Sequence, residues 1–69
     1  MQFLKVTNRA RVFKAPGSIV KIGDLLNETV PLRDVHEGWY EVDVRHNGRF
    51  PAHRPVGFVK KAEGMTVSY

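Results

Sequence analysis

The side chains that could carry acid–base or metal chemistry in this sequence are three histidines and a series of acidic residues. His36, His46 and His53 are spaced too widely and irregularly for a recognised metal signature, and the chain has no cysteine for a thiolate site. The carboxylates that could pair for general acid–base catalysis are Asp24, Asp34, Glu37, Glu41 and Asp43. No nucleophile, glycine-rich phosphate loop or nucleophile elbow accompanies them. We therefore expect no enzyme activity, no metal and no cofactor, and interpret these residues as turn and surface groups.

The single tryptophan is the best candidate for ligand binding. Trp39 begins the stretch WYEVDVR, in which polar and apolar residues alternate. Successive side chains of a strand point to opposite faces, so Tyr40, Val42 and Val44 are predicted to face inward and Trp39 outward. An outward aromatic ring with a polar group is a common anchor in binding surfaces. Alternatively, the indole lies flat over the rim of the fold and shields it.

The elements that must position these residues are predicted to be short strands, because no window shows helical periodicity. Strands are expected at residues 3–6, 19–22, 26–32, 39–45 and 56–60, with a brief pairing at residues 11–13 and the start of a return strand at residues 49–50. Turns are expected at Pro16-Gly17, at Gly23-Asp24, at residues 36–38 and at the His46-Asn47-Gly48 hairpin. Pro31 cannot donate to a central ladder, so its strand should lie at an edge, be bulged or bend.

These elements predict an all-β fold. About five or six short strands in so small a chain favour a small barrel, because closure of the sheet removes exposed edges. The barrel is expected to form a single domain over residues 1–69. The tail, residues 62–69, is either loose or adds an edge strand.

Composition limits the partners. The chain has a formal net charge of +4, and no apolar run approaches the ~18 residues of a membrane span. The N-terminal residues show no signal peptide, so we expect a cytoplasmic protein that does not enter a membrane. The basic patch, in a stretch without acidic residues, comprises Arg9, Arg11, Lys14 and Lys21. This patch either contacts nucleic-acid phosphates or is a solvated basic loop.

Three phrases of the sequence resemble Src-homology-3 domains. KIGDLLNETVPLRDVHEGWYEV is similar to their central pattern of diverging turn, apolar strand, acidic turn and Gly-Trp-aromatic step. VGFVKK resembles the closing strand of the bacterial group, with Phe58 in place of the usual Trp, and ARVFKAPGS resembles the opening of that group. The resemblance covers about residues 6–61. It implies a five- to six-stranded Src-homology-3-like barrel with Trp39 in a ligand groove.

A second register of the resemblance is possible. GRFPAH is similar to the Gly-Leu-Phe-Pro-Ser-Asn of the eukaryotic group, which would make Phe50 and Pro51 groove residues. In the bacterial register they belong to a long hairpin loop, and Gly57-Phe58-Val59 takes the closing position. We favour the bacterial register, because VGFVKK supplies the last strand. The eukaryotic opening Ala-Leu-Tyr-Asp-Tyr is absent, and the basic first loop would repel an arginine-bearing polyproline ligand.

The predicted ligand-binding residues are Trp39, Phe13, Phe50, Pro51 and His53. Phe13 is either the opposite groove wall or a core residue, and the loop with the last three is either functional or a rigid connector. We expect a non-enzymatic accessory or assembly protein of bacterial or phage type that binds a peptide or protein surface. Nucleic-acid binding through the basic loops is the alternative, and a subunit that associates through an exposed strand is a third. A cell-wall polymer is less favoured, because the sequence shows no catalytic domain and no export signal.

Overall fold

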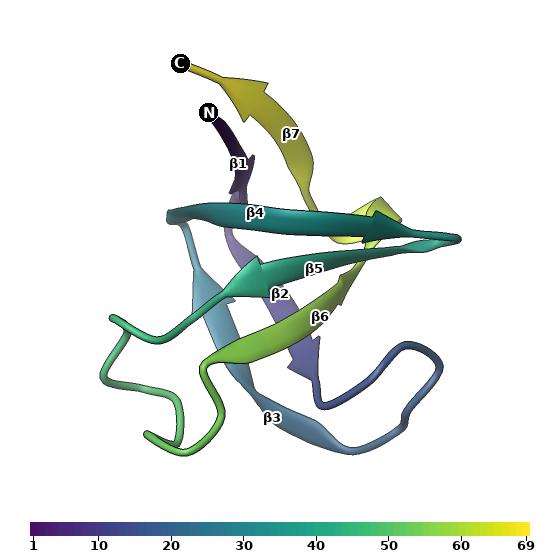
Figure 1. The fold of residues 1–69 in the computed structure, drawn as a ribbon, viewed down its shortest axis with the longest axis vertical. Helices are drawn as coiled ribbons and strands as arrows, with labels where there is room; N and C mark the ends of the chain where they lie inside the picture. The colour runs from purple at the N-terminus through teal and green to yellow at the C-terminus, as the bar shows by residue number, and fades with distance from the viewer.

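The computed structural model describes residues 1–69 and contains one antiparallel sheet (Figure 1). Its strands are β1 (Gln2–Lys5), β2 (Arg9–Phe13), β3 (Lys21–Leu26), β4 (Thr29–His36), β5 (Trp39–Asp43), β6 (Val56–Lys60) and β7 (Met65–Ser68). A 3₁₀ turn, η1 (Lys61–Glu63), joins β6 to β7. The prediction of an all-β fold is therefore confirmed. None of the helical structure is long and apolar enough to cross a bilayer.

The sheet has seven strands in the order β3-β2-β6-β5-β4-β1-β7 and is not closed into a barrel. The prediction of five or six strands was too low because the tail adds β7, which pairs along the whole of β1. This pairing occupies the free edge of β1, and β3 and β7 remain the two edges of the sheet. The two ends of the chain also meet there, where the Tyr69 amide donates to the Met1 carbonyl oxygen at 3.2 Å (Figure 1).

The core lies on the inner face of this curved sheet. Its buried residues are Leu4, Val6, Ala10, Val12, Leu25, Val30, Val42, Val44, Phe50 and Val59. Val42 and Val44 face inward as the alternation predicts, while Tyr40 is half-buried and packs against the core from its margin. Most of these side chains are branched aliphatic groups, which pack well on a pleated surface.

The boundary between β3 and β4 differs from the prediction. Gly23 and Asp24 lie inside β3 rather than in a turn, and the turn falls at Asn27, whose φ is +45°. Asparagine tolerates this left-handed conformation, so Asn27 forms the turn between β3 and β4. Gly23 is needed in the strand for a different reason. A side chain there would meet the Phe50 ring, because a Cβ would lie 2.7 Å from its Cε1.

The predicted single strand over residues 26–32 is therefore wrong, since its first residue ends β3 and β4 begins at Thr29. Pro31 lies within β4, opposite Phe3 of β1. Just after it, the register between β4 and β5 shifts between Leu32 and Asp34, as in a β-bulge. Of the three arrangements expected around this proline, the bulge is the one present.

The connection between β5 and β6 is a loop over residues 44–55 and not a tight hairpin. The Val44 amide bonds to the Pro55 carbonyl at 2.9 Å across the base of the loop. The predicted return strand at residues 49–50 is absent, because Phe50 turns inward and is buried in the core, with 7% of its surface exposed. The predicted strand at residues 56–60 is confirmed as β6. Phe50 and Pro51 therefore lie in a long hairpin loop, as the favoured register expects.

Candidate functional site

The pairing of four neighbouring strands gathers aromatic and charged side chains on the outer face of the sheet. Directly paired residues of antiparallel strands point to the same side. One row across the sheet runs His36, Trp39, Lys60, and the next runs Asp34, Glu41, Phe58, Phe13. We call these seven residues the outer-face surface.

The aromatic part of this surface is centred on Trp39. The rings of Phe13 and Trp39 pack edge to face, with their centroids 5.6 Å apart and their planes at 90°. The Lys60 ammonium lies 5.8 Å from the Phe13 centroid and 5.9 Å from the Trp39 centroid. Cation–π attraction and edge-to-face packing hold the indole in one orientation. Trp39 is therefore on the outer face as predicted, but it is half-buried rather than freely exposed.

Phe13 occupies a position between the two predicted alternatives. It is buried, with 7% of its surface exposed, yet it does not belong to the core cluster. Its ring lies under Trp39 and Lys60, and the Arg11 guanidinium carbon lies 5.9 Å from its centroid. A buried phenylalanine on the outer face supports the indole from below and offers little area to a ligand itself.

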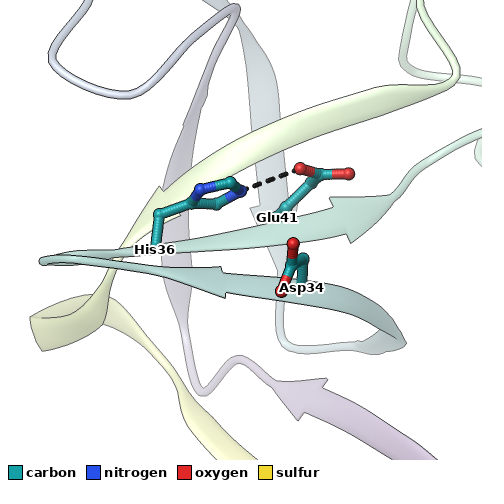
Figure 2. Close-up of side chains that lie close together, drawn as sticks. All are labelled: Asp34, His36 and Glu41. Carbon is teal, nitrogen blue, oxygen red and sulfur yellow. Dashed lines mark hydrogen bonds and ion pairs between the residues drawn. The ribbon is translucent and has the colours of Figure 1, made fainter.

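The polar part of the surface lies at the β4–β5 hairpin (Figure 2). His36 Nε2 lies 2.9 Å from Glu41 Oε1, and Asp34 lies close to both. The Arg33 guanidinium pairs with the other carboxylate oxygen of Glu41, with Nε to Oε2 at 3.5 Å. The Phe58 ring packs beside the imidazole, with centroids 5.6 Å apart. One imidazole and two carboxylates are therefore assembled on one rigid hairpin.

The spacing of the three histidines does not reveal this cluster, but a different signal in the sequence does. Asp34 and His36 are two residues apart on one strand, so they share a face. The short turn at Glu37-Gly38 then places Glu41 directly opposite Asp34. The relevant pattern is therefore a pair of alternate positions on one strand and a third across a tight hairpin.

The loop residues predicted to bind ligand do not join this surface. Trp39 is at the start of β5, whereas the loop of residues 44–55 follows the other end of that strand. Phe50 fills the core, and Pro51 and His53 are exposed on the loop. This arrangement favours the interpretation of the loop as a connector that inserts one core residue.

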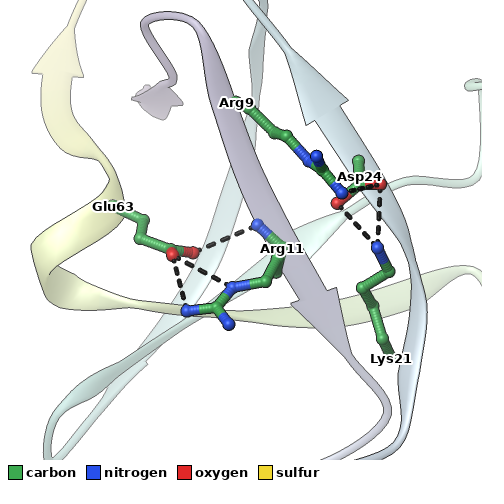
Figure 3. Close-up of polar contacts among 5 residues, drawn as sticks. All are labelled: Arg9, Arg11, Lys21, Asp24 and Glu63. Atoms are coloured by element: carbon green, nitrogen blue, oxygen red, sulfur yellow. Dashed lines mark hydrogen bonds and ion pairs between the residues drawn. The ribbon is translucent and has the colours of Figure 1, made fainter.

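The basic patch is largely compensated by Asp24 of β3 and Glu63 of η1 (Figure 3). Arg9 and Lys21 pair with Asp24 at 3.2 and 3.0 Å, and Arg11 holds both oxygens of Glu63. The hydrogen bond from Arg9, followed by that from Lys21, lowers the pKa of Asp24. Lys14 alone in this patch forms no ion pair in the structure. The sequence misses this compensation because Glu63 comes from the tail, 52 residues away from Arg11.

An open pocket of about 350 Å³ lies near the β5–β6 loop, away from Trp39. Its lining residues are Glu28, Thr29, Val30, Pro31, Asp43, His46, Asn47 and Gly48. The carboxylates in it already have partners, since Glu28 binds Asn47 and Arg49 while Asp43 binds Arg45. No buried side-chain nitrogen or oxygen in the molecule lacks a hydrogen-bond partner. The two carboxylates of the pocket are therefore already engaged in contacts within the molecule.

Comparison of the chain with protein-family models, with curated proteins and with solved structures finds no match. A functional interpretation must therefore come from the geometry of the molecule itself. The outer-face surface is the strongest basis for one, because it combines the Trp39 indole, the Lys60 ammonium without an ion pair and a histidine–carboxylate cluster.

Proposed function

We propose that this chain is a non-enzymatic interaction module that holds a peptide or a protein surface against Trp39. The observation that carries the proposal is the edge-on packing of the indole on a buried Phe13 beneath the Lys60 ammonium. A large aromatic ring held in one orientation loses little conformational entropy on binding. Tryptophan is also enriched among the residues that supply most of the binding energy in protein interfaces.

The surroundings of Trp39 favour a ligand with an apolar anchor and an acidic side chain. The loop that follows Phe13 carries two exposed apolar side chains, Ile19 and Val20, whose exposed fractions are 94% and 49%. Lys14 and Lys60 form no salt bridge within the molecule, so an acidic group could approach them without displacing a partner. The positive charges give orientation and a faster encounter, while the apolar contacts supply most of the affinity.

We extend this proposal to the family of the fold. The order of the strands after the first loop, with Trp39 at the start of β5 and Gly57-Phe58-Val59 in the paired strand β6, supports an open variant of the bacterial Src-homology-3-like fold. In such a variant, β7 covers the edge of β1 that closure of a barrel would otherwise cover. A small accessory or assembly role fits a module of this kind.

Nucleic-acid binding is the contrasting interpretation. The patch that suggested it is paired with Asp24 and Glu63, so phosphates would have to displace existing ion pairs. Glu41 on the outer-face surface also opposes a polyanion. Binding led by phosphate contacts weakens steeply as salt rises, and this property separates the two interpretations.

The test uses a displayed library of peptides selected against the wild-type protein. A selected peptide is titrated against the wild type and against Trp39→Ala by calorimetry. We expect the variant to bind at least about 30-fold more weakly, equivalent to the ~2 kcal/mol of a hot-spot residue. Tyr69→Ala is the matched control, because Tyr69 is 81% exposed and packs on Phe3 at the far end of the sheet.

Equal affinity of wild type and Trp39→Ala would remove the indole as the anchor. An oligonucleotide that binds at low salt and is released at moderate salt would favour the nucleic-acid interpretation instead. Circular dichroism of both variants checks that each keeps the β-sheet.

A further inference from the structure

We propose that Asp34, His36 and Glu41 form a binding site for a divalent transition-metal ion, with Zn²⁺ the best fit. The three side chains each offer one ligand atom, and these atoms lie within 4.8 Å of one another (Figure 2). Ligands of one ion at zinc–nitrogen and zinc–oxygen distances of about 2.0–2.2 Å are separated by no more than this. The proposal does not rest on peptide binding, although the three ligands share the outer-face surface with Trp39.

The backbone of the hairpin sets the relative positions of the three ligands. Asp34 and Glu41 are directly paired across β4 and β5, and His36 is paired with Trp39 at the turn. Strand positions hold side chains more accurately than loops do. The backbone therefore places all three ligands on one face of one hairpin, and a metal would draw their side chains closer together.

The two oxygens of Glu41 already have separate roles. Oε1 faces the imidazole, and Oε2 faces the Arg33 guanidinium. A metal would therefore replace the imidazole contact at Oε1 while Arg33 keeps the carboxylate oriented through Oε2. Outer partners of this kind typically change metal affinity about 10–100-fold when they are removed. The Phe58 ring restricts the imidazole in the same way by packing beside it.

The donor set selects the class of ion. Imidazole nitrogen with carboxylate oxygen suits Zn²⁺ and its transition-metal neighbours, whereas Ca²⁺ takes six to eight oxygen ligands and Mg²⁺ retains several waters. Three protein ligands leave at least one coordination position for water or for a side chain from a binding partner. Asp34 is exposed, so an ion reaches the site directly from solvent.

In the protein without metal, two of the proposed ligands contact each other, and this contact competes with binding of the ion. The contact of 2.9 Å between His36 Nε2 and Glu41 Oε1 must be exchanged for two bonds to the metal. The positive charge of Arg33 also opposes a cation, although it stands on the far oxygen of the carboxylate. We therefore expect a site that fills when zinc is supplied in solution and not a site that is needed for folding.

The experiment titrates ZnCl₂ into untagged protein and follows heat and thermal unfolding, with CaCl₂ and MgCl₂ as comparison ions. We expect one Zn²⁺ per chain and a rise in Tm that grows with zinc concentration, because the folded state alone assembles the ligands. His36→Ala and Asp34→Asn each remove a proposed ligand. Each is therefore expected to weaken zinc binding at least about 10-fold, which is the smallest effect that loss of an outer partner typically causes. His53→Ala is the matched control, since His53 is an exposed histidine outside the cluster.

The result that overturns the proposal is wild-type protein that binds no Zn²⁺ at millimolar concentration, or His36→Ala protein that binds it as the wild type does. Asp34→Asn guards against a folding artefact, because Asp34 is exposed and its contact with the Val35 amide is retained by an asparagine oxygen. Substitution of Co²⁺ gives a visible spectrum in the wild type that should be lost in His36→Ala. Trp39→Ala keeps all three ligands, so loss of peptide binding with zinc binding retained in this variant tells the two proposals apart.

Discussion

The Trp39 indole and the Phe13 ring meet at 90° on the outer face of the sheet, with centroids 5.6 Å apart. The pair joins β2 to β5 although β6 lies between them in the sheet. Trp39 and the Phe13 ring that supports it therefore lie on two strands that are not hydrogen-bonded to each other.

Phe13→Leu should loosen the indole while keeping the sheet. Edge-to-face pairs contribute about 0.5–1.5 kcal/mol beyond their buried area, and we expect a loss of stability of about that size or slightly more. Trp39 fluorescence should shift to longer wavelength as water reaches the ring. Phe3→Leu serves as the control, because Phe3 packs on Tyr69 instead. An unchanged spectrum in Phe13→Leu would contradict the proposed support.

Gly57→Ala should destabilise the protein strongly. A Cβ at Gly57 would overlap Cγ1 of Val12, a fully buried residue of β2. Overpacking of a dense core costs about 1–3 kcal/mol, and more where a strand must move. Gly48→Ala is the control, since no atom lies within 4 Å of a Cβ there. Adding Val12→Ala to Gly57→Ala should recover part of the loss in a double-mutant cycle, and additive effects would count against direct contact.

Asn8→Ala and Asn8→Gly should differ in stability. Asn8 has a φ of +67°, and its carbonyl accepts a hydrogen bond at 2.8 Å from Asn27, which also has positive φ. The left-handed conformation costs an ordinary L-residue about 1–2 kcal/mol. We expect Asn8→Ala to lower the Tm by about 4–8 °C and Asn8→Gly to leave it nearly unchanged. Equal losses of stability in the two variants would show that the asparagine side chain, and not the left-handed backbone, accounts for the contribution of Asn8.

The free energy of unfolding should decrease as the pH is lowered, because Asp43 becomes protonated. Its hydrogen bond from the Arg45 guanidinium holds the pKa of Asp43 below the ordinary value, although burial opposes this shift. A carboxyl group with a lowered pKa in the folded state stabilises fully above its unfolded pKa of about 3.9. That contribution is lost as the pH falls through the folded-state pKa.

Asp43→Asn should therefore be less stable than the wild type at pH 7, by about 1–3 kcal/mol, and should lose less on acidification. Urea denaturation at several values between pH 7 and pH 2 measures both quantities. Parallel pH curves for the two proteins would mean that another carboxylate controls the acid sensitivity.

Features that depend on residues close together in the sequence are predicted correctly more often than features that depend on contacts between distant segments. The alternation at Tyr40, Val42 and Val44 and the strand at residues 56–60 are predicted by local pattern. The tight hairpin at Asn47-Gly48 is also a strong local signal, yet it is overruled because Phe50 gains more by entering the core. Turn propensity amounts to a small local preference, whereas burying a phenylalanine side chain contributes about 1.5–3 kcal/mol.

The sequence by itself determined the strand-rich class of this protein and the outward side of Trp39, because the pleat of a strand repeats every two residues. Only the tertiary structure decided that the tail becomes a seventh strand and that Glu63 neutralises Arg11. It also decided that Phe13 lies beneath the indole. These features depend on which strands become neighbours, and that choice is made by packing between segments far apart in the chain.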